Sequence, residues 1–404
     1  MKEERTYWLA WSQVPGVGPI LLLRLKQHCG TLAEAWSASA KAIGEVEGFG
    51  VRLVEAVEKV RSQINPVQFL EEHSIKNPFF WTPADADYPR LLLEIPSPPP
   101  VLYYRGQVNL DENQGIKPTV SIVGTREPSD YGKRWTRRIS IALAKHGFTV
   151  VSGMAAGIDT EAHQGCLDSG GRTIGVLGTG VDIVYPPRNK SLYEQIQQQG
   201  LIISEYPAGT QPNRPHFPQR NRIIAGLTRA VLVMEAPPKS GALITAYQAQ
   251  EFCRDIYALP GSLDNHNSSG CLALLSRGAN VILSEEHLLN MLGVIEAVDT
   301  GEQLSLFPQE KPKAISNLKR DNTSADIKIG SGEGKSKVES NQPSEPNLTP
   351  ELAQVFQTLG YEAKSFDLII QESGLAIGLV SSYLLQLELM GLVSQLPGMQ
   401  YRRC

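Results

Sequence analysis

The sequence predicts an α/β protein with a doubly wound, extended Rossmann-like parallel sheet between a helical N-terminal domain and a C-terminal winged helix. Residues 118–290 alternate short apolar runs with helical stretches, two early glycine turns each precede an amphipathic run, and the final residues have a helix, turn, helix and hairpin pattern. We therefore expect a helix-hairpin-helix or SAM-like domain at 1–75, an extended Rossmann-like domain at 76–298, a flexible linker at 299–347 and a winged-helix-like domain at 348–404.

The N-terminal domain is predicted from the glycine turns Pro15–Gly18 and Glu47–Gly50, which are followed by the runs ILLLRLKQHC and VRLVEAVEKV. This layout is typical of paired helical hairpins, whose loop amides can hold a DNA phosphate. The two loops contain no Lys or Arg, so a purely structural role is equally well supported.

The sheet is predicted from a strand at 101–104 and from a series of continuous apolar runs. In chain order these runs are TVSIVG, TVVSG, TIGVLG, LIISEY, AVLVMEA, IYALPG and NVILSE. Runs of this kind, separated by amphipathic helices, indicate parallel strands that are covered on both faces. The linker is predicted from its mixture of Ser, Asn, Lys, Glu, Gly and Pro, which is poor in apolar residues.

The winged helix is predicted from a helix, a turn, a second helix at 376–390 and a hairpin around Pro397–Gly398. The second helix contains no Lys or Arg, whereas a helix that reads the major groove normally presents Arg, Lys, Asn or Gln. We expect this module to contact protein or to tune access of DNA weakly, with Arg402 and Arg403 as its basic residues. A transcription regulator acting through this helix is correspondingly disfavoured.

Composition places the chain among ordinary proteins of several globular units, with 404 residues, 41% hydrophobic residues and a net charge of -4. The first residues contain no apolar run as long as a signal peptide or a membrane span, so we expect a cytoplasmic protein without a membrane partner. Five scattered cysteines without C-x-x-C spacing predict reduced thiols and no zinc site. Residues 121–230 contain 13 Lys and Arg but 8 Asp and Glu, which favours an anionic ligand in the sheet domain.

Polar and glycine residues follow the predicted strands where the carboxyl ends of a parallel sheet meet, which is where such sheets bind ligands. The candidate binding residues are Gly124, Thr125, Arg126, Ser152, Gly153, Ala155, Gly157, Ile158, Asp159, Arg188, Arg214, Phe217, Arg220, Asn221, Arg222, Ser240 and Gly241. Glycine lets a backbone approach a phosphate closely, helix-start amides donate to it, and arginine adds a bidentate fork. One such loop alone is explained by turn geometry, but arginine in several loops favours phosphate binding.

Enzymatic alternatives have weaker support. The turn at Gly124 is not G-x-G-x-x-G, which disfavours a nicotinamide cofactor, and the P-loop-like stretch 330–336 is one residue short and lies in the linker. Asp159 and His163, four residues apart, are compatible with an acid/base pair and equally with a helix cap and a packing histidine. We find no metal-ligand spacing or catalytic triad, and therefore expect a protein that is not an enzyme and needs no cofactor.

The candidate segments together resemble a known family. The motifs VSIVGTREPSDYG, VVSGMAAGIDTEAH, GGRTIGVLGTGVDIVYPPRN, ISEYPAGTQP, FPQRNRIIAGL and SGALITAYQA, in this order, are similar to those of the DNA processing protein A family (DprA, also called Smf). The similarity covers the whole sheet domain and extends into DYPRLLLEIPSPPPVLYYRG. The family often has Gly-Ser-Arg where this chain has Gly124-Thr125-Arg126, a change that keeps the hydroxyl.

The resemblance implies a homodimeric protein that binds and protects single-stranded DNA and loads the recombinase RecA on it during natural transformation. It assigns phosphate contacts to the arginines and glycine loops given above and a base contact to Phe217, with Tyr185, Tyr206 and His216 as further aromatic candidates. The alternative is an enzyme of the nucleoside-monophosphate phosphoribohydrolase type. Such enzymes have a Pro-Gly-Gly-x-Gly-Thr loop, and this chain has Lys239-Ser240-Gly241-Ala242-Leu243 in the comparable place.

Overall fold

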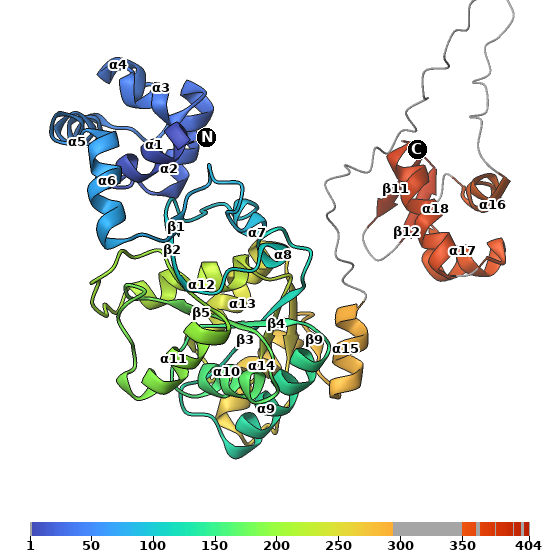
Figure 1. Cartoon of the computed structure of the whole chain (residues 1–404). Coiled ribbons are helices and arrows are strands. Elements are labelled where there is room, and N and C mark those ends of the chain that lie inside the picture. The colour runs from blue at the N-terminus through green and yellow to red at the C-terminus, as the bar shows by residue number, and fades with distance from the viewer. Residues whose placement is uncertain are drawn as a thin grey trace, which may run out of the picture. The chain divides into compact units, whose positions relative to one another are not determined.

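The computed structural model describes residues 2–293, 350–360, 364–375, 377–390, 392–396 and 400–403. The chain divides into two compact units, Met1–Glu310 and Lys311–Cys404 (Figure 1). The predicted linker at 299–347, with its P-loop-like stretch, lies outside the described residues. No helix in the described part of the chain is both long and apolar enough to span a bilayer.

A nine-stranded sheet forms the centre of the first unit, in the order β1-β2-β6-β5-β4-β3-β7-β8-β9. Its strands are β1 (Phe80–Trp81), β2 (Leu102–Gly106), β3 (Thr119–Val123), β4 (Thr149–Ser152), β5 (Thr173–Leu177), β6 (Leu201–Ser204), β7 (Ala230–Val233), β8 (Asp255–Ala258) and β9 (Asn280–Val281). Strands β3 to β9 correspond to the seven predicted runs and are parallel to one another. The strand β2, predicted at 101–104, pairs antiparallel with β6, and the unpredicted β1 pairs antiparallel with β2.

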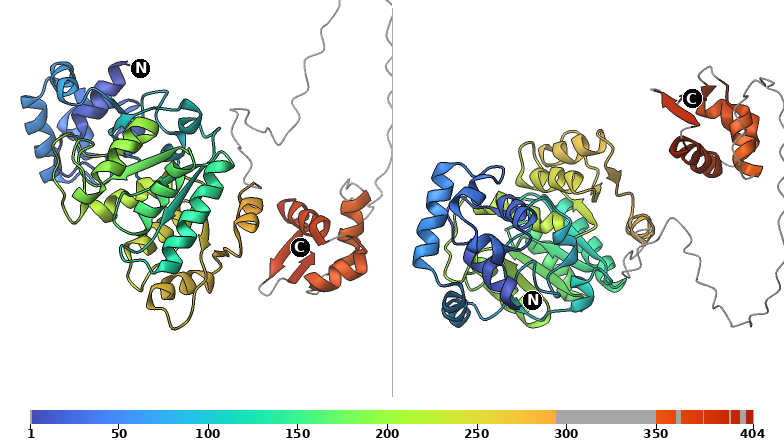
Figure 2. Two further views of the ribbon diagram at one scale, coloured as in Figure 1. Left: turned by 60° about the horizontal axis from the view of Figure 1, so that its bottom comes forward. Right: turned by 90° about the horizontal axis from the view of Figure 1, so that it is seen from above.

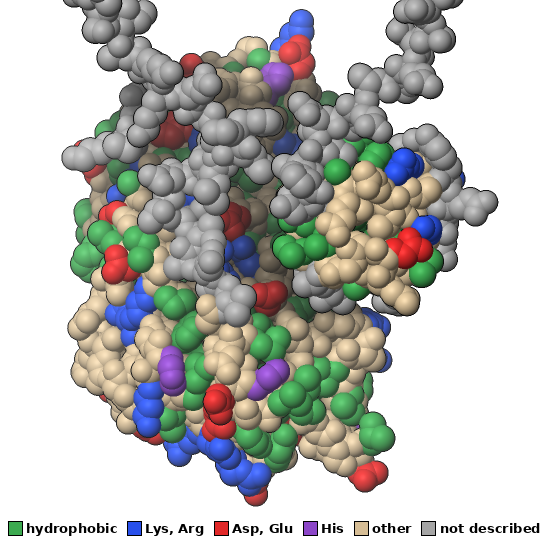
Figure 3. Space-filling model, turned by 90° about the vertical axis from the view of Figure 1, so that its right-hand side faces the viewer, with side chains coloured by type: hydrophobic (Ala, Val, Ile, Leu, Met, Phe, Trp, Pro, Cys, Tyr) green, Lys and Arg blue, Asp and Glu red, His purple; other side chains and the backbone are tan. Residues whose placement is uncertain are grey.

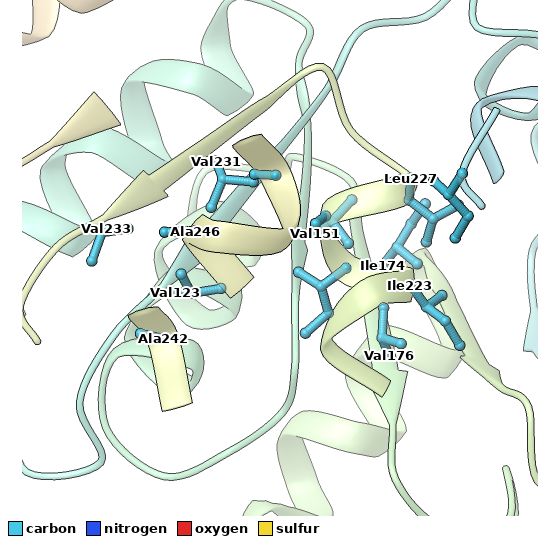
Figure 4. Packing of buried hydrophobic residues seen from close by; sticks show 14 of the residues in the cluster. Val123, Val151, Ile174, Val176, Ile223, Leu227, Val231, Val233, Ala242 and Ala246 are labelled. Carbon is cyan, nitrogen blue, oxygen red and sulfur yellow. The ribbon is translucent and has the colours of Figure 1, made fainter. Parts of the chain in front are cut away.

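Helices cover both faces of this sheet, as predicted for a doubly wound fold (Figures 1 and 2). They are α7 (Arg90–Leu93), α8 (Leu110–Asn113), α9 (Asp130–Lys145), α10 (Ile158–Asp168), α11 (Lys190–Gln199), α12 (His216–Gly226), α13 (Gly241–Glu251), α14 (Ser269–Leu275) and α15 (Glu285–Gly293). On one face, β-branched strand residues such as Val151 and Val231 pack against Ile223 of α12 and Ala246 of α13 (Figure 4). The other face packs against α9, α10 and α11 through a second set of buried residues that includes Ile139, Ala162 and Ile196.

The N-terminal helices form their own core and also pack on the sheet domain. They are α1 (Lys2–Trp11), α2 (Pro19–Cys29), α3 (Leu32–Ser37), α4 (Ala40–Gly44), α5 (Val51–Gln63) and α6 (Pro66–Lys76). Both predicted glycine turns are present, because Gly16 and Gly48 adopt φ values of +85° and +96° that L-residues rarely adopt. Leu9 of α1 is buried in one cluster with Phe80 and Tyr103, which ties this helical part to the sheet edge.

The second unit has the predicted winged-helix elements. Its helices are α16 (Pro350–Thr358), α17 (Phe366–Ser373) and α18 (Ile377–Leu389), and its antiparallel sheet has the order β10 (Lys364–Ser365), β12 (Gln400–Arg403), β11 (Val393–Leu396). Arg403 donates to the Phe356 carbonyl oxygen at 2.7 Å, and Lys364 pairs with Glu372 at 2.7 Å. Arg402 is exposed, so it is the basic residue of the predicted pair that faces solvent.

Candidate nucleic-acid interface

A cleft of about 920 Å³ lies at the carboxyl ends of the parallel strands, where the loops after β3, β4, β5 and β7 meet the first turn of α12. Its lining includes Val123 at the end of β3, and the loops that follow the parallel strands supply much of the rest, as expected for a doubly wound sheet. Eleven of the predicted binding residues line it: Gly124, Thr125, Arg126, Ala155, Asp159, Arg214, Phe217, Arg220, Asn221, Ser240 and Gly241. The predicted convergence of several loops at one edge of the sheet is therefore present.

The ring of Phe217 lies close to two of the cations in this cleft, Arg126 and Arg220. The guanidinium carbon of Arg126 is 5.7 Å from the centroid of the Phe217 ring, and that of Arg220 is 6.0 Å away. Both distances allow a cation–π attraction, which holds the two side chains beside the ring. Tyr185 extends the aromatic surface, because its ring centroid is 5.3 Å from that of Phe217 and its side chain is 39% exposed.

Arg220 is a buried residue that fixes the wall of the cleft. It is only 4% exposed, and its guanidinium donates to the carbonyl oxygens of Gly153, at 2.6 Å, and of Val176. These bonds join the second turn of α12 to the ends of β4 and β5. Burial lowers the pKa of Arg220 to about 10, with the nearby Arg126 acting in the same direction and Asp159 opposing it. The guanidinium therefore keeps its charge at neutral pH.

Asp159 and His163 have structural surroundings. Burial raises the pKa of the Asp159 carboxyl, while Arg220 and the backbone amide of Ala155, which donates to Oδ2 at 3.2 Å, oppose that change. His163 is fully buried, with Nδ1 2.7 Å from the Thr173 hydroxyl, and burial lowers its pKa to about 3. The structure therefore supports the packing histidine. Asp159 is the second residue of α10, which begins without a side-chain cap, and its carboxyl accepts instead from the loop after β4.

Glycines hold the loops of the cleft against each other. Gly157 has a φ of +83°, and a Cβ built on it lies 2.4 Å from the carbonyl oxygen of Thr125. A Cβ on Gly124 lies 2.5 Å from the side chain of Ile158, whose amide donates to Thr125 at 3.1 Å. The loops after β3 and β4 are thus in contact. Their glycines serve this close packing at least as much as access for a ligand.

Six of the predicted residues do not line the cleft: Ser152, Gly153, Gly157, Ile158, Arg188 and Arg222. The first four lie in or next to the loop after β4 but are not part of the lining. The hydroxyl of Ser152, for example, donates to the carbonyl oxygen of Ile122 at 2.6 Å. Arg222 forms an ion pair with Glu205 at 2.6 Å and donates to the carbonyl oxygen of Ser97 at 3.1 Å. Two residues apart on α12, Arg220 and Arg222 therefore have separate surroundings.

The remaining arginine and aromatic candidates lie beside the cleft. Arg188 is exposed in the short 3₁₀ helix Pro187–Asn189, outside the lining. The rings of Tyr206 and His216 stack on each other at 3.9 Å, also outside the lining. His216 Nδ1 lies 3.2 Å from the Gly178 carbonyl oxygen, which secures the start of α12.

Glu235, at the end of β7, was not among the predicted residues. It is 1% exposed, and its carboxylate accepts from the amide of Ser129 at 2.8 Å, from the hydroxyl of Ser129 at 2.5 Å and from Asn265 at 3.3 Å. It therefore connects the loop after β3 to the loop that supplies the cleft residues His266 and Asn267. The signal available in the sequence was the charge that ends the apolar run AVLVMEA.

The lining has an excess of positive charge. Arg126, Arg214 and Arg220 are its cations and Glu127 and Asp159 its carboxyl groups, with the Asp159 pKa raised by burial. Within the described residues, no group of three or more His, Cys, Asp or Glu side chains is arranged to hold a metal ion. The cleft thus combines cations with the half-buried ring of Phe217 and the exposed ring of Tyr185, and cations and aromatic rings are the two elements that hold an unpaired nucleic-acid strand.

The chain is also similar to known proteins. The family model described as DNA recombination-mediator protein A matches residues 79–293, and the DprA winged helix domain model matches 339–399. The chain is 56% identical to Protein Smf of Synechocystis sp., over 99% of both chains, and 44% identical to DNA processing protein DprA of Streptococcus pneumoniae, over 51% of this chain and 71% of that protein. The X-ray structure of DprA from Streptococcus pneumoniae matches with a TM-score of 0.63 and 36% identity, over 70% of this chain and 97% of that chain. The family model covers more than half of the chain and the Smf relative nearly all of it, so this chain belongs to the DprA/Smf family of DNA-processing proteins, as the motifs predicted.

Proposed function

We propose that this chain binds single-stranded DNA in the cleft at the carboxyl ends of the strands, without catalysing a reaction on it. The observation that carries the proposal is the placement of Arg126 and Arg220 over the ring of Phe217. The exposed Arg126 and Arg214 supply charge for the phosphates, and Phe217 and Tyr185 supply faces on which unpaired bases stack. A duplex buries those base faces, so the aromatic part of the site favours a single strand.

We also propose that the bound strand is protected and then passed to the recombinase RecA. The family description as a recombination mediator supports this role. A mediator has to bind DNA of any sequence. Contacts with phosphates and with base faces allow this, because all four nucleotides have both. The winged helix would then meet a protein or tune access of DNA, since α18 contains no Lys or Arg.

A homodimer is the third part of the proposal. The edge strand β9 ends beside Leu283, which is 65% exposed, and this edge is the surface that we assign to the second copy. Acidic, basic and hydrophobic side chains are mixed on the face shown in Figure 3. Light scattering of the purified chain tests the assembly. A dimer mass that falls to the monomer mass on Leu283→Asp supports it, and a monomer mass for the unaltered chain removes it.

The test of DNA binding is a fluorescence anisotropy titration at low ionic strength, without nucleotide, with labelled oligothymidylate and with a duplex of equal length. We expect the single strand to bind at least tenfold more tightly. A parallel assay for release of adenine from AMP covers the phosphoribohydrolase alternative. Base release, or equal affinity for duplex and single strand, contradicts the proposal.

A further inference from the structure

A second pocket lies at the β2 edge of the sheet domain, between the end of α6 and the helix α11. Its volume is about 320 Å³, and its lining includes Lys76, Phe79, Tyr103, Arg105 and Gln197. The side chains of Tyr103 and Arg105 are on the same side of β2, because alternate residues of a strand face the same way. Neither the predicted site residues nor the cleft include any of these side chains.

The charge of this pocket is uniformly positive. Its described lining holds the two cations Lys76 and Arg105 and no carboxyl group, and neither cation forms an ion pair with another described residue. Arg105 hydrogen-bonds the hydroxyl of Tyr193, which in turn donates to the carbonyl oxygen of Val181. The guanidinium is therefore held in place by a neutral partner, and its charge is free to meet an anion.

An exposed aromatic ring lines the same pocket as these cations. Phe79 is 56% exposed, although its ring centroid is 5.7 Å from that of Tyr104, and it is positioned by the backbone bond from the Tyr104 amide to the Phe79 carbonyl oxygen at 3.1 Å. Tyr103, on the other side of β2 from Tyr104, is fixed by its hydroxyl, which lies 3.0 Å from Nε2 of His73. The pocket thus has an aromatic surface for stacking and two cations for a phosphate in one lining.

The pocket and the cleft are lined by the same two loops. In the loop after β5, Val181 lines the pocket and Tyr185 lines the cleft; in the loop after β6, Ala208 lines the pocket and Arg214 the cleft. The amide of Ala208 donates to Oδ1 of Asn77 at 2.8 Å, which anchors the second loop to the end of α6. A strand that leaves the cleft across these loops arrives at the pocket.

We propose that this pocket is a second nucleotide subsite for the strand held in the cleft, taking one base against Phe79 and a phosphate between Lys76 and Arg105. The inference rests on the proposed function, since the cleft anchors the strand. Sites of this kind span roughly 4–16 nucleotides, so short strands fill the cleft alone and longer ones also reach the pocket. A free mononucleotide has the same chemistry but no anchor in the cleft.

The test compares the length dependence of oligothymidylate affinity, from about 4 to about 20 nucleotides, in the unaltered chain, in Phe79→Leu and in the double variant Lys76→Gln/Arg105→Gln. Lys59→Gln, on the exposed surface of α5, is the matched charge control. We expect short strands to bind all four proteins equally. Long strands should bind both pocket variants more weakly, and for Phe79→Leu we expect a loss of at least about fivefold, the lower limit for one stacked base. The same length dependence in all proteins, or equal loss for short and long strands, overturns the inference.

Photo-cross-linking separates this inference from the proposed function. A long strand with a terminal 5-iodouracil should cross-link to the peptide that contains Phe79, and Arg126→Ala should reduce that product because it weakens the anchor. Cross-linking of free 5-iododeoxyuridine monophosphate to the same peptide with equal yield overturns the strand subsite in favour of a mononucleotide pocket. If short strands fail to bind the unaltered chain at all, the proposed function itself fails.

Discussion

Arg126 and Arg220 approach the same aromatic ring, that of Phe217, at 5.7 and 6.0 Å. Arg126 is exposed in the loop after β3, whereas Arg220 is buried in the second turn of α12. Their like charges repel, and Arg126 contributes to the lowered pKa of Arg220. A phosphate bound between them relieves this repulsion, so the pair is suited to an anion that also carries a base for the ring to stack on.

Arg126→Ala should weaken binding to all single-stranded sequences alike, because the residue is an exposed cation that is expected to meet the backbone. The slope of log affinity against log salt should fall by about 0.7 for each phosphate contact that is lost. A salt titration by anisotropy measures this slope. Arg52→Ala, on the exposed surface of α5, is the control and should keep the original slope. An unchanged slope in Arg126→Ala removes this residue from the site.

Arg220→Ala should lower stability as well as affinity. The substitution leaves two backbone carbonyl groups without their buried donor and takes the cation away from the buried Asp159. Leaving a buried polar group without its hydrogen-bond partner costs about 1–3 kcal/mol for each group. Urea unfolding should show this loss for Arg220→Ala and no loss for Arg126→Ala. Equal stability of the two variants contradicts the positioning role assigned to Arg220.

Phe217→Leu should weaken single-strand binding by about 1–3 kcal/mol, the usual value of one base stacked on an aromatic ring. The informative comparison uses strands with and without bases. On ordinary oligothymidylate the variant should bind more weakly than the unaltered chain, whereas on a fully abasic strand the two proteins should bind equally. An equal loss on both strands means that the ring supports the fold of the cleft instead of stacking on a base.

Glu235→Gln should weaken the hydrogen bonds that hold the loops around the cleft, although Glu235 does not itself line the cleft. The carboxylate holds Ser129 through two bonds and Asn265 through a third, and the neutral amide cannot accept all three with the same strength. We expect a stability loss of about 1–3 kcal/mol and faster hydrogen exchange in residues 124–129. Exchange that is unchanged in this loop argues against the positioning role.

His163 should make the sheet domain lose stability in acid. Its folded-state pKa of about 3 is below the ordinary value of 6.5 for an unfolded chain, so its contribution is complete above pH 6.5 and decreases as the pH falls toward 3. The slope for this one group is about 1.4 kcal/mol per pH unit. Urea unfolding at pH 7, 6 and 5 should show a shallower pH dependence for His163→Gln. An identical pH dependence in the two proteins places the acid sensitivity elsewhere.

The fold was predictable because its signals are local and strong. Seven runs rich in β-branched residues, each followed by a helical stretch, predict a parallel sheet. All seven form strands, β3 to β9. The two-residue β1 was missed, since Phe80 and Trp81 carry no periodic pattern and pair only because the chain leads them to β2. Most of the cleft followed from the same argument, because parallel topology brings the strand ends together.

The directions in which the side chains point could not be predicted from the sequence. Arg220 and Arg222 have the same chemistry in one motif, but two residues on a helix point about 200° apart, so one enters the cleft and the other meets Glu205. Glu235 was missed for a related reason. The role of a single acidic residue at the end of a strand depends on its hydrogen-bond partners. Here the partners are Ser129 and Asn265, which are distant in the sequence, so the role could not be predicted.

The most direct measurement of the central claim is photo-cross-linking of a short oligonucleotide with one 5-iodouracil to the intact chain, followed by mass spectrometry of the peptides. Binding in the cleft should give products at Phe217 and Tyr185, with a yield that falls in Arg126→Ala. Products confined to the N-terminal glycine turns or to the winged helix, or none at a concentration that saturates binding, would contradict it.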